Sequence, residues 1–162
     1  MTRPDKNKLA EALRERVARE LQTLRESQQA AQDGAIHEET RQEDPKDTRA
    51  IEAQYVARGL AERVEELQRT VAILAHMQLD TFGSDDPIDV SAVVGLKDGD
   101  GEKIYFLVPV AGGESLEVDG SVVQTLTPSS PLGLAMVGKC VDDEVELALP
   151  GRQIVAEVDW VG

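Results

Sequence analysis

The segment QEDPKDTR, residues 42–49, gathers three carboxylates around one proline between two candidate helices. Short carboxylates of this kind can accept hydrogen bonds at a helix N-terminus or bind a hard cation. Asp44 is a suitable N-cap, Pro45 suits the first helical position, and Asp47 falls at the third position, where its charge favours the positive helix end. The segment is therefore either a well-formed turn or the working end of the molecule.

Other reactive residue types are isolated along the chain. The loop DGDGE at 98–102 superficially resembles a calcium loop, but it lacks the acidic ligand twelve positions after the first, and Asp-Gly favours a hairpin turn. His37 and His76 each stand without a neighbouring serine or cysteine. Cys140 is the only cysteine, which excludes an intramolecular disulfide and zinc-site spacing. These patterns favour no enzyme of the triad, zinc or phosphate-loop classes.

The charge of the chain is strongly acidic and unevenly distributed. The formal net charge is −14 over 162 residues. Residues 1–80 carry 16 acidic and 13 basic side chains, whereas residues 81–162 carry 15 acidic and 4 basic ones. Such a chain repels phosphate backbones, so autonomous nucleic-acid binding is not expected. The start of the sequence has no apolar signal core and no run of about 20 apolar residues, so we expect a cytoplasmic protein without membrane contact.

Two long amphipathic helices are predicted in the first half. Apolar residues recur at helical spacing before and after the charged segment. They are Leu9, Leu13, Val17, Leu21, Leu24 and Ala31, and then Ile51, Ala57, Leu60, Val64, Leu67, Val71, Leu74 and Leu79.

The two helices are predicted to pair antiparallel as a coiled-coil hairpin. Facing residues of such a pair have numbers with a constant sum, and Leu21 with Leu67 and Val17 with Val71 both give 88, which places the reversal at Asp44. Each arm, residues 8–40 and 47–79, would be about 50 Å long. A hairpin of this kind suits reaching towards a partner, although an ordinary oligomerisation hairpin is an open alternative.

The second half predicts a compact, mainly antiparallel β domain, with the boundary near residue 80. Six partly alternating segments are separated by Gly- and Asp-rich turns. These are residues 88–96, 103–110, 115–119, 121–126, 144–149 and 154–161. One short helix is predicted in SSPLGLAMVGK, with Ser130 as cap, Pro131 at the first position and Gly138 at the exit. The fold class is thus α+β, with domains 1–80 and 81–162.

Two stretches of the sequence resemble the bacterial Gre transcript-cleavage factors. The C-terminal run TPSSPLGLAMVGKCVDDEVELALPGRQIVAEVDWV contains SP, a small-residue helix, GK, DEV and PG in the order found in that family. The stretch HEETRQEDPKDTRAIEAQYVA is similar to the acidic coiled-coil tip, where an Asp and a Glu three apart precede the returning helix. Here those positions are Asp44 and Asp47. The resemblance spans essentially the whole chain, although the central strands carry few diagnostic residues.

The resemblance implies a transcription elongation factor that acts on RNA polymerase and is not itself an enzyme. An FKBP-like C-terminal domain would dock on the polymerase through the segment of Ser130 and Pro131, and the hairpin would enter the secondary channel as a monomer. Asp44 and Asp47 would then help to hold a Mg²⁺ ion shared with the polymerase active site and stimulate cleavage of backtracked RNA. Two short acids could complete such a site without binding Mg²⁺ tightly alone.

Basic residues beside the tip have a matching expected role. Arg41, Lys46 and Arg49 could contact phosphates of the RNA 3′ segment inside the polymerase complex, although charge balance at a solvated tip would also explain them.

Two alternatives stay open at this point. Asp47 is one methylene shorter than the family's Glu and Pro45 stiffens the tip, which fits a channel-binding regulator that inhibits polymerase without stimulating cleavage. An FKBP-like prolyl isomerase or chaperone is the alternative of another class, but an aromatic content of 3% argues against it.

Overall fold

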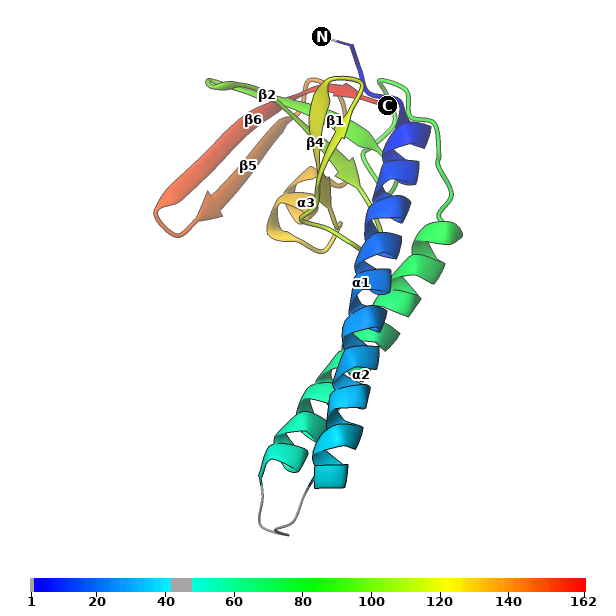
Figure 1. The fold of residues 1–162 in the computed structure, drawn as a ribbon. Coiled ribbons are helices and arrows are strands. Elements are labelled where there is room, and N and C mark those ends of the chain that lie inside the picture. The colour runs from blue at the N-terminus through cyan, green and yellow to red at the C-terminus, as the bar shows by residue number, and fades with distance from the viewer. Residues whose placement is uncertain (1, 42–47) are drawn as a thin grey trace. The chain divides into compact units, whose positions relative to one another are not determined.

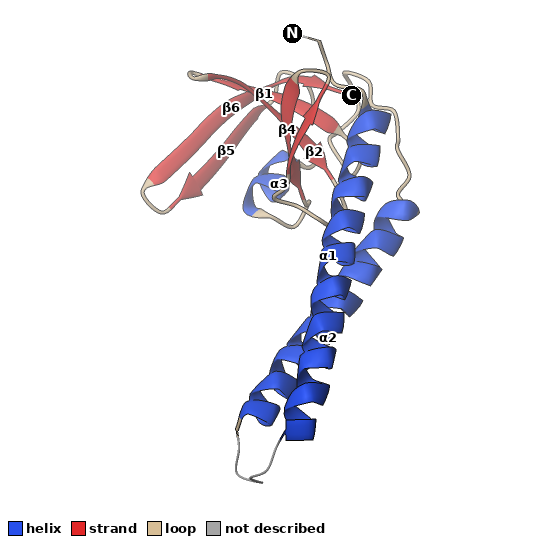
Figure 2. Ribbon diagram, viewed as in Figure 1, coloured by secondary structure: helices blue, strands red, loops and turns tan. Residues whose placement is uncertain are grey.

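The structure, a computed structural model, describes residues 2–41 and 48–162, with side chains described outside residues 35–41. The chain forms two compact units that are not continuous in sequence. One unit combines Met1–Arg14 with Ile73–Gly162, and the other is Glu15–Ala72. The elements are two long helices, α1 (Lys6–Arg41) and α2 (Arg49–Ala75), then six strands and a short helix, α3 (Pro131–Met136) (Figures 1 and 2). The predicted α+β architecture is confirmed.

The predicted seam between α1 and α2 contains buried residues on both helices. Val17, Leu21, Val64 and Leu67 are buried. At the other end of the helices, the Arg14 Nε donates a hydrogen bond of 2.7 Å to the Leu74 carbonyl, and these two residue numbers also sum to 88. This contact agrees with the constant-sum pairing, because one residue of advance on one helix matches one of retreat on its antiparallel partner, while the predicted reversal at Asp44 lies outside the described residues.

The prediction that Ile51 belongs to this seam is wrong. Its side chain is 51% exposed, whereas the neighbouring Ala50 is buried. The reason is helical geometry: at 100° per residue, the step of six from Ile51 to Ala57 rotates the side chain about 120° off the stripe. Ala50 lies seven residues before Ala57 and stays on the seam.

Helix α2 ends at Ala75, four residues before the predicted arm ends at Leu79. His76 N and Met77 N donate to the carbonyls of residues three positions back, each at 3.3 Å, which is the tightened last turn typical of a helix end. The guanidinium of Arg14 donates to the Leu74 carbonyl and also, at 3.4 Å, to the Met77 carbonyl. A cation at the C-terminal carbonyls stabilises this end of the helix.

Six strands form one sheet in the order β3-β4-β2-β1-β6-β5. The strands are β1 (Val93–Asp98), β2 (Gly101–Leu107), β3 (Ser115–Val118), β4 (Ser121–Leu126), β5 (Glu144–Leu149) and β6 (Arg152–Val161). Each of the six predicted segments overlaps one of them. The segment predicted from Ile88 becomes a strand only at Val93, because Ile88 N and O bond to the Lys139 carbonyl and the Gly138 amide instead.

The sheet is antiparallel except for the β2–β4 pair, which is parallel. The predicted hairpin at DGDGE joins β1 to β2, with Asp98 paired to Gly101 and the Asp100 amide donating to Asp98 Oδ1. The parallel β2–β4 pair forms because Asp119 and Gly120, both with positive φ, turn β3 directly back into β4. That hairpin places β4 beside β2 in the same direction.

Side chains on the two faces of the sheet belong to different layers. Helix α3 packs on one face through Leu132, Ala135 and Met136. Buried residues of this face are Val94, Leu96, Tyr105, Leu107, Val145, Ala156 and Val158. By alternation along the same strands, Val93, Ile104 and Phe106 point to the opposite face, where Phe106 is fully buried. The sheet therefore has buried residues on both faces.

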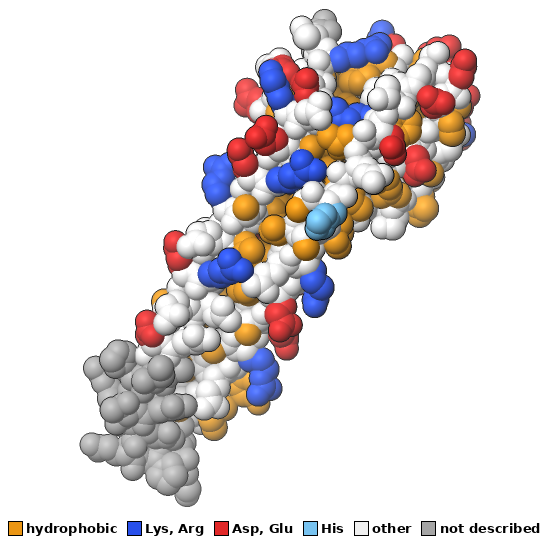
Figure 3. Space-filling model, turned by 90° about the vertical axis from the view of Figure 1, so that its right-hand side faces the viewer, with side chains coloured by type: hydrophobic (Ala, Val, Ile, Leu, Met, Phe, Trp, Pro, Cys, Tyr) orange, Lys and Arg blue, Asp and Glu red, His pale blue; other side chains and the backbone are white. Residues whose placement is uncertain are grey.

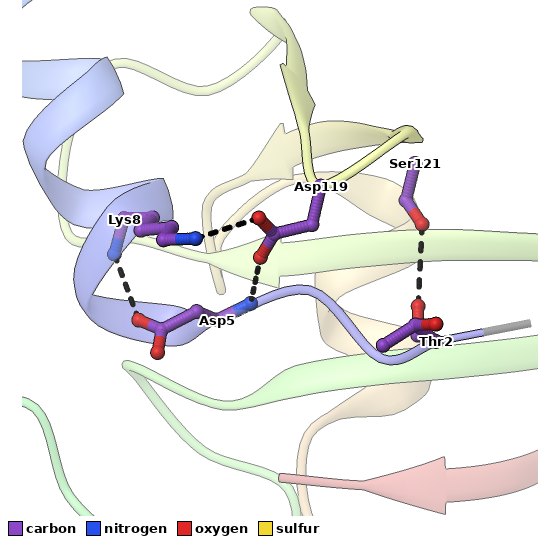
Figure 4. A network of polar contacts seen from close by, with 5 residues as sticks. All are labelled: Thr2, Asp5, Lys8, Asp119 and Ser121. Atoms are coloured by element: carbon purple, nitrogen blue, oxygen red, sulfur yellow. Dashed lines mark hydrogen bonds and ion pairs between the residues drawn. The ribbon is translucent and has the colours of Figure 1, made fainter.

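The chain start is tied to the β3–β4 hairpin by a polar network (Figure 4). Asp119 Oδ1 accepts from Lys8 Nζ at 2.7 Å, and its Oδ2 accepts from the Asp5 amide at 3.2 Å. Ser121 Oγ donates to the Thr2 carbonyl at 3.4 Å. The hydrogen bond from Lys8 raises the pKa of that amine and lowers the pKa of the Asp119 carboxyl. These contacts explain why the first residues belong to the same compact unit as the sheet.

Two further cations of this segment contact aromatic rings. The Arg3 guanidinium lies 4.8 Å from the centroid of Trp160, and Lys6 Nζ lies 4.8 Å from that of Phe82. Lys6 also donates to the Asp80 carbonyl at 2.6 Å, and its partial burial lowers the pKa of its amine. Basic residues at the chain start thus offset part of the acidic charge of the β region.

Candidate functional site

The acidic tip of the hairpin lies outside the described residues, together with Asp44, Lys46 and Asp47. The side chain of Arg41 is likewise outside them, although Arg41 is the last residue of α1. Of the predicted tip residues, only Arg49 has a described side chain: it is the first residue of α2 and is exposed. The metal and RNA roles of all five residues stay predictions.

The first described turn of α2 begins directly after the tip. The Glu52 amide donates to the Thr48 carbonyl at 2.9 Å, and Glu52 is the acidic residue of the first helical turn. Amides at a helix start carry a partial positive charge, so this end of α2 favours nearby anions. The predicted N-cap role of Asp44 falls on the undescribed residues and is not tested.

The surface of the helical unit mixes charges of both signs along its length, as the side view in Figure 3 shows. Arg63 illustrates the arrangement, because it bonds to Glu66 on its own helix at 2.9 Å and to Glu20 on α1 at 3.2 Å. Near the tip α2 also presents exposed apolar side chains: Ile51, Tyr55 and Val56.

Ser130 is the N-cap of α3, as predicted, and its polar groups bond within the chain. Its Oγ accepts from the Gly133 amide at 3.1 Å and donates to the Thr127 carbonyl at 2.7 Å. Pro131 occupies the first helical position, and Gly138 follows the helix with φ of 86°. Ser130 therefore fixes the start of α3, and its hydroxyl is engaged within the chain.

The outer face of α3 is apolar and exposed. Leu134 is 68% exposed and Val137 is 38% exposed, and both follow the exposed Pro131 at intervals of three residues. Gly133 and Met136 are buried on the inner face, and a Cβ at Gly133 would clash with the Thr127 carbonyl. Sequence reasoning missed Leu134 and Val137. The signal was the uninterrupted apolar run PLGLAMV, which is too apolar for a helix that can bury only one side.

The described residues contain no group of three or more His, Cys, Asp or Glu side chains placed to hold a metal ion. The two acids of the tip provide oxygen donors, which is the ligand chemistry that Mg²⁺ prefers. Two carboxylates are fewer than a complete Mg²⁺ shell requires, so their donor chemistry fits a site completed by other molecules. Within the described residues, no helix is long and apolar enough to span a bilayer.

Comparison with known proteins gives matches among solved structures alone. No protein-family model matches the sequence, and no curated protein matches it. The chain is similar to the transcription factor Gfh1, with 24% identity, coverage of 93% of both chains and a TM-score of 0.40. It is also similar to Gfh1 of Thermus thermophilus, with 23% identity, coverage of 93% of this chain and 95% of that one, and a TM-score of 0.38.

A further match is the prokaryotic transcription elongation factor GreA/GreB from Nitrosomonas europaea. It is 21% identical, covers 62% of this chain and 92% of that one, and has a TM-score of 0.35.

Proposed function

We propose that this protein is a Gre-type transcription elongation factor that binds RNA polymerase and stimulates cleavage of backtracked RNA. The proposal rests on one combination: two acids at the reversal point of a helical hairpin, in a chain whose sheet domain carries the capped SP helix. The sequence resemblance supplies the roles, and the helical spacing of the sequence, through the constant sum of 88, predicts the reversal at Asp44. The factor acts as a monomer inside the complex and completes a catalyst that polymerase provides.

Docking is assigned to the outer face of α3, formed by Pro131, Leu134 and Val137. Ser130 acts as a positioning residue, because its hydroxyl is engaged with Thr127 and Gly133. Burial of Leu134, which is 68% exposed, would contribute to binding through the hydrophobic effect. The face is small, so it would form one part of a larger contact with polymerase.

At the tip, Asp44 and Asp47 would supply carboxylate oxygens to a Mg²⁺ ion that is otherwise held by polymerase and RNA. When bound, that ion activates water and stabilises charge on the phosphate. Arg41, Lys46 and Arg49 would hold RNA phosphates close to the acids and reduce repulsion between the acidic chain and RNA. The exposed position of Arg49 at the start of α2 is compatible with this role.

The docking claim is tested with the full chain, because the compact sheet unit includes residues 2–14 and a fragment beginning at 81 would lose Leu9, Ala10 and Leu13. We expect core polymerase to retain the wild-type protein at low salt and one to one, and Leu134→Glu to be lost. Val155→Glu is the matched control, since Val155 is an exposed apolar residue on β6, and it should be retained. Equal retention of both variants would remove docking from α3, and no retention of the wild type would remove polymerase as the partner.

The inhibitor alternative is favoured by two residues. Asp47 reaches less far than the Glu of the family, and Pro45 restricts the tip between the two acids. If this alternative holds, the wild type slows elongation on a natural template and leaves backtracked RNA uncut. Polymerase binding is expected whether the protein stimulates cleavage or inhibits elongation, so the transcription assay is what distinguishes these two functions.

A further inference from the structure

A cavity of about 490 Å³ lies on the α3 face of the sheet, away from the exposed outer face of α3. The buried side chains of Leu96, Tyr105 and Ala156 form its floor. Leu132 of α3 contributes to its lining, as does Val122 of β4, a valine that is 61% exposed. The volume falls within the range of small-molecule sites, and the floor is apolar as in such sites.

The charged groups that line this cavity differ in whether they already have hydrogen-bond or ion-pair partners. Lys103 and Arg152 have exposed side chains and show no hydrogen bond or ion pair within the described part of the chain. Of the two acids in the lining, Glu102 alternates with Lys103 along β2 and accepts from the Trp160 indole, so its carboxylate belongs to the opposite face of the sheet. Asp98 accepts from the Asp100 amide and keeps its negative charge. The cavity side of the sheet therefore has two cations against one carboxylate.

This concentration of cations stands out in its domain. Residues 81–162 contain four basic side chains against 15 acidic ones, and Lys103 and Arg152 are two of those four. Two cations brought together from β2 and β6 favour an anion locally, while the acidic surroundings disfavour large polyanions such as nucleic acid. Charge and shape together select a small anion with an apolar body.

The phenol of Tyr105 adds a neutral hydrogen-bonding group to the floor. Burial raises the pKa of Tyr105, and the nearby charge of Asp98 raises it further against the opposing charge of Arg152. The hydroxyl therefore stays protonated at neutral pH and can donate to an anion. Tyr105 is also the only aromatic residue in the described lining, which is poor support for a prolyl-isomerase pocket.

We propose that this cavity is a binding site for a small amphipathic organic anion, with its apolar body on Leu96, Tyr105 and Ala156 and its acidic group between Lys103 and Arg152. The site is independent of the hairpin tip and of the α3 docking face. It would give the factor a ligand of its own, whichever effect it has on polymerase.

The test uses the full-length protein and two dyes of similar shape, measured by fluorescence titration. 8-Anilinonaphthalene-1-sulfonate carries the anionic group, and N-phenyl-1-naphthylamine lacks it. We expect the sulfonate to bind with one-to-one stoichiometry and the neutral dye to bind at least about tenfold more weakly. Lys103→Glu combined with Arg152→Glu should reduce sulfonate binding at least about tenfold, as expected for loss of two charge contacts.

Lys97→Glu is the matched control, because Lys97 is an exposed lysine of the adjacent strand β1 and does not line the cavity. It should leave sulfonate affinity within about twofold of wild type. Circular dichroism establishes that each variant is folded, and Lys103→Gln with Arg152→Gln replaces the double variant if the latter unfolds. Equal binding of both dyes, several sulfonates per chain, or an equal loss in Lys97→Glu would overturn the proposal.

Discussion

The helical unit and the sheet unit differ in how many apolar side chains they bury. The structure describes 28 buried hydrophobic side chains, of which only Val17, Leu21, Ala50, Val64 and Leu67 belong to residues 15–72. The sheet unit holds the others, which lie on both faces of its sheet, in its loops and α3, and on the ends of α1 and α2 that belong to this unit. A two-helix seam buries one narrow stripe per helix, so most of each helix remains surface. The sheet unit therefore supplies most of the stability, whereas most of the surface of the helical unit stays exposed.

The largest effect that follows from this comparison is expected at Phe106, which is fully buried in the sheet unit. Phe106→Ala should destabilise the protein by about 3–5 kcal/mol, because it removes a large apolar side chain and leaves a cavity. Chemical denaturation of the full chain measures this. A loss below about 1 kcal/mol would contradict the assignment of Phe106 to a close-packed layer.

In the helical unit the same kind of change should cost less. Leu67→Ala is expected to destabilise by about 2 kcal/mol, the lower end for buried leucines, since a seam is open on both sides. Ile51→Ala is the matched control outside the seam and should change stability by less than about 0.5 kcal/mol. Equal losses of stability in the two variants would mean that Ile51 also packs in the seam and would contradict its observed exposure.

A smaller effect is expected at α3, where the two faces of a short helix can be separated. Gly133→Ala should destabilise by about 1–3 kcal/mol, because the new methyl group meets the Thr127 carbonyl and must displace it. Leu134→Ala, one residue further along and exposed, should leave stability unchanged within about 0.5 kcal/mol. If Leu134→Ala destabilised the protein more than Gly133→Ala, the assignment of the inner and outer faces of α3 would be wrong.

The smallest effect is expected at the exposed contact of Lys8 with Asp119. The folded pKa of Asp119 lies below its ordinary value of 3.8, so its contribution is present above that value and is lost as pH falls through the folded pKa. Asp119→Asn keeps a residue that tolerates the positive φ of this position but removes the charge. The stability difference between wild type and variant should therefore shrink as the pH is lowered below about 4, and a difference that grows instead would reverse the assignment.

The sequence predicted the repetitive features well because periodicity reports directly on burial. Helical spacing identified the buried residues Val17, Leu21, Val64 and Leu67, and six alternating segments located six strands. It failed where tertiary contacts decide: α2 ends at Ala75, where Arg14 bonds to its terminal carbonyls, and Ile88 bonds to the loop after α3 rather than to a strand. Helix spacing, applied more strictly, would have excluded Ile51.

The candidate sites differ in how far the sequence predicted them. Ser130 was identified through its capping signature, and the structure gives it that role. Leu134, Val137 and the cavity beside Tyr105 were not found, because each depends on which side of an element the fold covers. The cavity in addition joins residues of five elements that are distant in sequence, and no local pattern contains that information.

The proposed role of the tip acids in RNA cleavage can be tested with Asp44→Asn in backtracked polymerase complexes. Asn caps a helix about as well as Asp but cannot provide the negative charge that Mg²⁺ requires. We predict that the variant keeps its circular dichroism spectrum and its binding to polymerase, and loses most of the stimulation of cleavage expected with wild type. Stimulation by Asp44→Asn equal to that by wild type would contradict the account and leave Asp44 with a structural role alone.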